Sequence, residues 1–222
     1  MSSLSFSAVL LAAGQSSRMG RDKALLPVDP GEGPPYRGTV VGGGPVPPRA
    51  AGDDRATERT DHPGSALPLW RRQWAVLTRT GVAKIQLSVR PEQNWVPAGI
   101  PVVHDAQVDA GPLAGLAAAM AAMTSTHLLV LAVDLPHMEG AWFSGLMKLC
   151  SPGVGAVGRH EGYFEPLAAI YPRELLVAAE ATLAGGDRSL QRFIVGAGDA
   201  MRHHEITSAE APWFANWNEP VN

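Results

Sequence analysis

A short segment near the start of the chain combines a flexible turn with fixed positive charge. The apolar run 8–13 predicts a buried strand that ends at Gly14, and the small polar residues 15–17 follow it. Arg18 and Lys23 come within ten residues of this glycine. Backbone N–H groups in such a turn can point at an anion, which the two cations would neutralise. The spacing therefore predicts phosphate binding, although an ordinary strand-to-helix turn with surface cations would have the same residue types.

The same segment follows the pattern L-x-A-G-x-S-x-R-M-G-x-x-K. The matching residues are Leu11, Ala13, Gly14, Ser16, Arg18, Met19, Gly20 and Lys23. This pattern resembles the signature loop of nucleotidyltransferases that activate sugars and cofactors with nucleoside triphosphates, and it is most similar to that of the molybdenum cofactor guanylyltransferases. Neither a P-loop nor a dinucleotide-binding G-x-G-x-x-G turn has this spacing. We therefore expect triphosphate binding by a route other than those two folds.

A single carboxylate follows the most apolar stretch of the chain. The run 128–133 predicts a strand buried on both faces, and Asp134 comes directly after it. Ligands of open α/β sheets bind beyond the carboxyl ends of the strands, so Asp134 is placed to meet one. Mg²⁺ bound to triphosphate oxygens is the expected partner, because it favours one or two protein carboxylates plus phosphates. Asp134-Leu135-Pro136 resembles the family's metal-binding motif, and the alternative is a cap on the following helix.

The hexad GPLAGL, from Gly111 to Leu116, introduces an alanine-rich helix. Pro112 suits the first turn of a helix. A helix N-terminus beside a strand end would offer free N–H groups to a base or a phosphate. GPLAGL resembles the corresponding segment of the guanylyltransferases more than that of the related cytidylyltransferases.

The resemblance implies the remaining site residues. The tail from Phe214 to Pro220 is similar to the F-x-N-x-N-x-P segment that closes the family's domain, and its two asparagines would return to the site. The expected substrate-binding residues are Leu11, Ala12, Ala13, Gly14, Ser16, Lys23, Ser88, Asp105, Gly111, Pro112, Leu113 and Asn216. The expected catalytic residues are Arg18, Lys23 and Asp134, and the expected Mg²⁺ ligands are Asp134 and Asn218, with Asp105 in support.

Strand and helix patterns alternate along the chain, with short connections. This alternation predicts crossover units and a mainly parallel sheet. With the resemblance, it implies an α/β fold: a three-layer α/β/α sandwich with a Rossmann-like sheet. The predicted strands are 8–13, 84–89, 100–104, 128–133, 154–159 and 165–171. Predicted helices cover 67–80, 141–149, 173–183 and 189–195, in addition to the alanine-rich one.

Residues 29–66 interrupt this alternation with seven prolines and eight glycines in 38 residues. The segment has too few large apolar residues to offset the entropy lost on ordering, which predicts a loop or a disordered insertion. A mobile lid and a surface insertion without a role are the two interpretations. We favour the second, because long surface insertions cost little free energy. The rest of chain 1–222 is expected to form a single nucleotidyltransferase domain.

Two charged segments near the C-terminus are less informative. His203 and His204 would face opposite sides of a strand, which argues against a metal site. Asp187 or Ser189 is expected to cap a helix. The alternative for this segment is a contact between Arg188 or Arg192 and a substrate phosphate.

Composition excludes several classes of protein. The net charge of −3 gives no broad basic field for nucleic acid. A single cysteine, Cys150, rules out an intrachain disulfide and fits the cytoplasm, where we expect the protein. The N-terminus lacks the pattern of a signal peptide, and no apolar stretch approaches the roughly 20 residues of a membrane-spanning helix, so no membrane association is expected.

These observations together predict a Mg²⁺-dependent transferase. The expected reaction moves GMP from GTP to the phosphate of molybdopterin and releases pyrophosphate. Beyond these two substrates, molybdoenzymes or other cofactor-biosynthesis proteins are candidate partners. Two alternatives stay open: a related transferase that uses CTP or a sugar-phosphate acceptor, and a nucleotide-binding or docking protein without catalytic activity.

Overall fold

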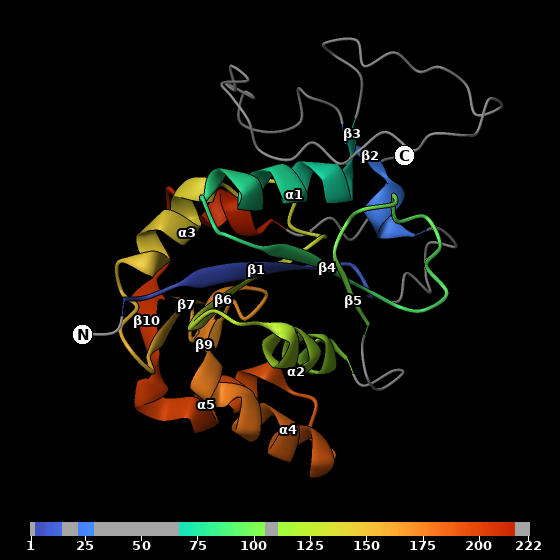
Figure 1. Ribbon diagram of the computed structural model, residues 1–222. Coiled ribbons are helices and arrows are strands. Elements are labelled where there is room, and N and C mark those ends of the chain that lie inside the picture. Colours follow the sequence, from blue (N-terminus) through green and yellow to red (C-terminus); the bar gives the residue numbers. More distant parts are fainter. Residues whose placement is uncertain (1–2, 15–21, 29–66, 105–110, 216–222) are drawn as a thin grey trace, which may run out of the picture.

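The computed structural model describes residues 3–14, 22–28, 67–104 and 111–215 of the chain. Its centre is one eight-stranded sheet (Figure 1). The strands are β1 (Phe6–Leu11), β4 (Ile85–Val89), β5 (Val102–His104), β6 (His127–Ala132), β7 (Gly155–His160), β8 (Tyr163–Phe164), β9 (Ala168–Pro172) and β10 (Met201–Glu205). Their order is β10-β7-β9-β6-β1-β4-β5, and β8 pairs with β7.

Six of these strands run in one direction. β1 is parallel to β4 and β6, β4 is parallel to β5, and β10 is parallel to β7. β9 is antiparallel to both β6 and β7, which makes β7 parallel to β6. The carboxyl ends of β1, β4, β5, β6, β7 and β10 therefore lie along one edge of the sheet, called the carboxyl edge below. The mainly parallel sheet is confirmed, with β8 and β9 as the antiparallel members.

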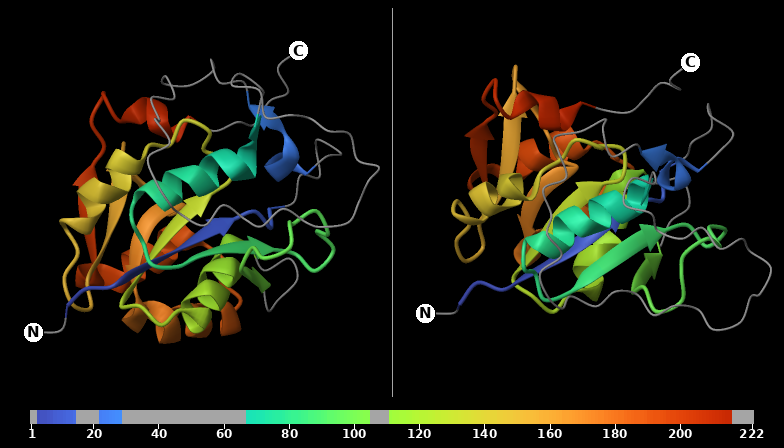
Figure 2. Two further views of the ribbon diagram at one scale, coloured as in Figure 1. Left: turned by 45° about the horizontal axis from the view of Figure 1, so that its top comes forward. Right: turned by 90° about the horizontal axis from the view of Figure 1, so that it is seen from above.

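Helices cover both faces of the sheet, as Figures 1 and 2 show. One face carries α1 (Leu69–Arg79) and α3 (Gly140–Met147), and the other carries α2 (Pro112–Ala122), α4 (Leu176–Ala184) and α5 (Leu190–Ala197). Short 3₁₀ helices are η1 (Lys23–Leu25), η2 (Arg173–Leu175), η3 (Gly198–Ala200) and η4 (Ala211–Phe214). This arrangement confirms the three-layer α/β/α sandwich.

The sheet separates two hydrophobic cores. Along β1, Ala8 and Leu10 face the α1 and α3 side, whereas Val9 faces the α2 side, as the alternation of a strand requires. All six residues of β6 are buried, which confirms the prediction of a strand covered on both faces. The strands at the centre of the sheet are therefore fixed from both sides, and their carboxyl ends are held in place by packing.

The bounds of three predicted strands differ by more than one residue from those observed. β1 ends at Leu11 and not at residue 13, and β5 begins at Val102 and not at residue 100. We expected a strand over 165–171, but β9 begins at Ala168, because Ala168 donates its N–H to the Glu165 carbonyl (3.2 Å) and closes a turn. Pro166 has no N–H to donate to a ladder, which also opposes a strand there. The predicted turn at Glu161 and Gly162 is confirmed, and both residues have positive φ (49° and 86°), as a tight hairpin requires.

Two short strands flank the proline- and glycine-rich segment. β2 (Pro27–Val28) pairs antiparallel with β3 (Leu67–Pro68), and Leu69 donates its N–H to the Leu26 carbonyl (2.9 Å). The chain therefore returns at Leu67 to the place it leaves at Val28. Residues 29–66 lie outside the described residues, so their predicted nature and the single-domain boundary stay predictions.

Among the described residues, no helix is both long and apolar enough to cross a membrane.

Candidate nucleotide-binding site

The carboxyl edge brings Asp134 beside the turn that follows β1. In the parallel pair, Leu11 lies opposite Ala132, and the Val133 N–H donates to the Leu11 carbonyl (3.0 Å). Asp134 follows Val133 directly, in the turn where the chain leaves β6, so it starts from the point at which β6 is bonded to the end of β1. Asp134 is half-buried and, within the described part of the chain, forms no ion pair or side-chain hydrogen bond. Its carboxylate is thus available to a ligand at this edge.

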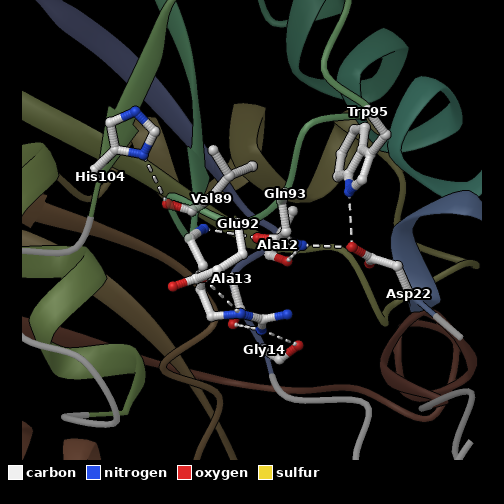
Figure 3. A network of polar contacts seen from close by, with 10 residues as sticks. Ala12, Ala13, Gly14, Asp22, Val89, Glu92, Gln93, Trp95 and His104 are labelled. Carbon is white, nitrogen blue, oxygen red and sulfur yellow. Dashed lines mark hydrogen bonds and ion pairs between the residues drawn. The ribbon is translucent and has the colours of Figure 1, made fainter. Parts of the chain in front are cut away.

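The carbonyl groups of this turn, Ala12 to Gly14 (the β1 turn), are held by the segment that follows β4. The Gln93 amide donates to the Ala12 carbonyl (3.0 Å). The Arg90 guanidinium donates to the carbonyls of Ala13 and Gly14, the latter at 3.0 Å (Figure 3). All three carbonyl groups are therefore engaged on one side of the turn.

The N–H groups of the β1 turn are arranged differently. The Ala12 N–H donates to the Ser88 carbonyl (2.9 Å), which continues the ladder between β1 and β4. The N–H groups of Ala13 and Gly14 have no hydrogen-bond partner among the described residues. A turn whose carbonyls are engaged and whose N–H groups are free presents donors, as an anion-binding backbone requires.

Lys23 starts the single-turn helix η1, and Asp22 caps it. Asp22 accepts a hydrogen bond from the Ala24 N–H through Oδ1 (3.0 Å). Its Oδ2 accepts from the Gln93 amide (2.6 Å) and from the Trp95 indole (2.7 Å), and Figure 3 shows both side chains pointing at this carboxylate. Lys23 is half-buried and has a polar interaction of its own. The lysine is thus fixed at the same end of the sheet as the β1 turn.

The loop after β6 is held by α1. Buried Gln73 donates to the Leu135 carbonyl, directly after Asp134, and the Met138 N–H donates to the same carbonyl (3.1 Å). The N-cap residue of α3 is Glu139, five residues beyond Asp134. The alternative that Asp134 caps the following helix is therefore wrong.

The N-terminus of α2 lies as predicted from GPLAGL. Gly111 precedes the helix with φ 74°, a value that favours glycine, and Pro112 is its first residue. No side chain caps this end. Leu113 is fully buried in the core, so a ligand would meet this helix through Gly111, Pro112 and the backbone N–H groups. α2 packs on β5, which places the helix in the first half of the sheet.

The structure describes only some of the predicted site residues. Leu11, Ala12, Ala13, Gly14, Lys23 and Asp134 lie at one edge of the sheet. Ser88 is fully buried, its carbonyl accepts from the Ala12 N–H, and it has a further polar interaction. Its role toward a substrate stays a prediction. Ser16, Arg18, Asp105, Asn216 and Asn218 lie outside the described residues.

The described residues contain no group of three or more His, Cys, Asp or Glu side chains that could hold a metal. One carboxylate is still enough for a Mg²⁺ ion that arrives with a triphosphate, because phosphate oxygens and water supply the other ligands of the ion. His203 and His204 belong to β10, so the expected strand is confirmed. The His204 ring lies 3.1 Å from the Glu210 carboxylate. The prediction against a histidine metal site stays a prediction.

The other end of the carboxyl edge is formed by β7, β8 and the N-terminus of α5. Gln191 accepts from the Phe164 N–H (3.0 Å) and donates to the Phe164 carbonyl (2.8 Å). Burial raises the pKa of the neighbouring Glu165 carboxyl, and the nearby His160 opposes the rise. This end therefore carries a carboxyl group that the fold holds partly out of water.

The predicted cap before α5 is confirmed. Ser189 is the N-cap and accepts from the Arg192 N–H (3.3 Å). The Arg192 guanidinium pairs with Asp187 (2.6 Å), and this hydrogen bond lowers the pKa of the Asp187 carboxyl to about 2. Arg188 also has a polar partner. A phosphate contact by either arginine stays a prediction.

Comparison with known proteins identifies the family. The MobA-like NTP transferase domain matches residues 8–205. The chain belongs to this family. A protein of Opitutus terrae named "Probable molybdenum cofactor guanylyltransferase" is 37% identical over 219 residues, which cover 95% of this chain and 89% of that protein. The molybdenum cofactor guanylyltransferase of Pseudomonas entomophila is 36% identical over 110 residues, which cover 49% of this chain and 58% of that protein.

A solved structure extends the comparison to the fold. Molybdopterin-guanine dinucleotide biosynthesis protein A of Archaeoglobus fulgidus superposes with a TM-score of 0.64 at 16% identity, covering 96% of this chain and 93% of that chain. At this identity the likeness concerns the fold alone. It confirms the α/β architecture expected of a MobA-like domain.

Sequence reasoning missed the side chains that support the site. Arg90, Gln93 and Trp95 lie in the segment R-P-E-Q-N-W, where only the proline suggested a turn. Gln73 lies on the buried face of α1, among apolar residues. A glutamine at a helix position that should be apolar is the one sequence signal that could have indicated a buried polar contact.

Proposed function

We propose that this member of the MobA-like family transfers GMP from GTP to the terminal phosphate of molybdopterin and releases pyrophosphate. One observation carries the proposal: the β1 turn, the helix that begins with Lys23 and the end of β6, which Asp134 follows, lie at one edge of the sheet. The names of the relatives support the choice of GTP and molybdopterin.

In this proposal the β1 turn and Lys23 bind the nucleotide. The free N–H groups of Ala13 and Gly14 contact the nucleotide, and Lys23 neutralises the triphosphate together with Arg18, which lies outside the described residues. Phosphoryl and nucleotidyl transfer need positioned reactants and neutralised charge more than covalent help from the protein. The fixed carbonyls of the turn supply that positioning.

The transfer step needs no side chain as a base. The terminal phosphate of molybdopterin is a monoester, which loses its second proton near about pH 6 and is anionic at neutral pH. One of its oxygens forms a bond to the α-phosphorus of GTP. The bond from this phosphorus to the oxygen shared with the β-phosphate breaks, and pyrophosphate leaves with the electron pair.

Asp134 is proposed as the protein's carboxylate ligand for Mg²⁺, with Asp105 and Asn218 in support from outside the described residues. The chemistry of the donor fits, because Asp134 is half-buried at a strand end and has no cationic partner among the described residues. When bound, the ion would offset negative charge at the α-phosphate and the leaving pyrophosphate. Without a counter-ion, the same carboxylate would repel the triphosphate.

The test is an assay of the purified full-length chain with molybdopterin, Mg²⁺ and each of GTP, CTP, ATP and UTP. Formation of the guanine dinucleotide and one pyrophosphate per transfer, selective for GTP, is the expected result. Equal or greater product from CTP, or product only with a sugar phosphate, would support a related transferase instead. Binding of GTP without pyrophosphate release with any acceptor would indicate a nucleotide-binding or docking protein.

A further inference from the structure

A glutamine outside the family signature links the two parts of the nucleotide site. One N–H of the Gln93 amide donates to the Ala12 carbonyl (3.0 Å), and the same nitrogen donates to Asp22 Oδ2 (2.6 Å). The Gln93 Oε1 accepts from the Arg90 N–H (2.7 Å). Ala12 belongs to the β1 turn, and Asp22 caps the helix that begins with Lys23. One side chain therefore fixes the distance between the turn and the lysine.

The chemistry of its neighbours determines which way this amide points. The groups at its nitrogen, the Ala12 carbonyl and the Asp22 carboxylate, can only accept, and the group at its oxygen, the Arg90 N–H, can only donate. A flipped amide would place an oxygen against two acceptors. Gln93 is only 9% exposed, so water cannot readily replace these contacts.

The turn that carries Gln93 is closed by a backbone hydrogen bond. The Gln93 N–H donates to the Arg90 carbonyl (3.0 Å) and closes a turn in which Pro91 occupies the position that favours proline. Trp95, which also donates to Asp22, packs against Trp70 of α1 with ring centroids 5.8 Å apart. The Gln93 amide and its hydrogen bonds to Ala12, Asp22 and Arg90 (the clamp) are therefore supported by both the sheet and a helix.

We infer that Gln93 is a positioning residue for the nucleoside triphosphate, because it keeps the β1 turn and Lys23 in register with each other. The inference rests on the proposed function, since it assigns the nucleotide to these two elements. Arg90 assists by engaging the carbonyls of Ala13 and Gly14, and Trp95 assists by holding Asp22. Loss of the glutamine amide should weaken the binding of GTP and leave the acceptor end of the site unaffected.

The test compares two glutamines that hold backbone in the same way. Gln93→Met removes the clamp with little change in side-chain volume, and Gln191→Met removes the two bonds to Phe164 at the other end of the carboxyl edge. The dissociation constant of GTP with Mg²⁺ is measured by titration calorimetry, and the melting temperature without ligand is measured for each chain. We expect about tenfold weaker GTP binding for Gln93→Met, because a bond to a charged group is among those lost.

For Gln191→Met, the expected dissociation constant lies within about twofold of wild type, because distant sites act independently. Both variants lose hydrogen bonds to backbone groups, at a buried site for Gln93 and at a half-buried site for Gln191, so both melting temperatures should fall. The fall in each melting temperature is compared with the change in GTP affinity of the same variant. GTP binding by a folded Gln93→Met within about twofold of wild type would overturn the inference, as would equal losses in both variants.

If Gln93→Met does not fold, Gln93→Glu replaces it. This variant keeps the shape and the acceptor for Arg90, and it places a carboxylate against Asp22 and the Ala12 carbonyl. It should weaken GTP binding at least as much, and unchanged binding would overturn the inference. A wild-type chain that binds GTP but forms no dinucleotide would contradict the proposed function alone, because the binding comparison does not need the acceptor.

Discussion

Two glutamines hold the loops at opposite ends of the carboxyl edge, and they do so in different surroundings. Gln93 is buried, and its amide joins three segments, one of which carries the charged Asp22. Gln191 is only half-buried and joins two segments through the N–H and the carbonyl of Phe164. The Gln93 amide of the β1–β4 end thus joins more segments, and at a more buried site, than the Gln191 amide of the β7–β10 end.

The difference extends to the charged groups of the two ends. At the β7–β10 end the pairs of Arg192 with Asp187 and of Arg159 with Glu205 are largely solvent-exposed, and such pairs stabilise a fold little. The pair of His204 with Glu210 is more shielded. At the β1–β4 end, neutral N–H donors surround the carboxylate of Asp22, and the exposed Glu92 pairs with Arg90 (3.9 Å).

The largest effect should come from Asp134. Asp134→Asn keeps the shape of the side chain and removes its charge, so turnover of GTP should fall by about 100-fold or more, because metal and electrostatic stabilisation of phosphoryl transfer is lost. Pyrophosphate release under saturating substrates measures this change. A loss below about threefold would place the reacting phosphates away from the end of β6.

Lys23→Ala should have the next largest effect and should act mainly on the nucleotide. Loss of one charged phosphate contact predicts a decrease of about tenfold or more in kcat/KM for GTP, with the KM for the acceptor almost unchanged. Steady-state kinetics with each substrate varied in turn separates the two values. An equal rise in both KM values would contradict a lysine that serves only the β1–β4 end.

Trp95→Phe sharpens the same comparison with a smaller change. The variant loses the indole N–H that donates to Asp22 and keeps the ring beside Trp70. We expect about a threefold to tenfold rise in the dissociation constant of GTP, since one hydrogen bond to a charged acceptor is removed. Arg192→Gln, which breaks the exposed pair with Asp187, is the control, and a comparable rise in that variant would refute the distinction between the two ends.

Glu165 tests the β7–β10 end through stability. Burial raises the pKa of this carboxyl in the folded state, so the folded chain binds the proton more tightly than the unfolded chain does. Stability is therefore lost as pH rises from the unfolded value through the raised folded value. Glu165→Gln should raise the melting temperature at pH 8 and have no such effect near pH 4, with a gain below about 1 kcal/mol because water still reaches the group.

A melting curve of wild type and Glu165→Gln at the two pH values checks this expectation. Equal differences at both pH values would show that charge is not the cause.

Replacement of residues 29–66 by a two-residue Asn-Gly turn should have the smallest effect. β2 and β3 already bring the ends of this segment together, so the substitution closes an existing hairpin. We expect kcat/KM for GTP within about twofold of wild type, because long surface insertions cost little. A larger loss would mean that the segment contributes to the site.

The order of the elements and the position of the central strand β6 could be predicted from the sequence, because they follow from local patterns, whereas β1 ends two residues before its predicted end. The apolar run before Asp134 predicts a buried strand, and β6 forms there. The proline of GPLAGL predicts the first turn of a helix, and α2 begins there. The antiparallel direction of β9 and the pairing of β2 with β3 depend on contacts between distant segments. Periodicity along the chain carries no signal for such contacts.

The residues of the candidate site also fall into a group that the sequence could predict and a group that it could not. The signature residues, such as Gly14 and Lys23, could be found because their types match a known chemistry. The residues that hold them, Gln93 and Trp95, could not, because a glutamine and a tryptophan in a polar loop have no special meaning until Ala12 and Asp22 are seen beside them. Side-chain bonds to backbone groups of distant segments are a property of the fold.

The central claim is that the β1 turn and Asp134 meet on one metal-charged nucleotide. Titration of GTP into wild type and Asp134→Asn, each with and without Mg²⁺, tests it most directly. We predict that Mg²⁺ tightens GTP binding by about tenfold or more in wild type and has no effect in Asp134→Asn. The same Mg²⁺ effect in both chains would contradict the claim.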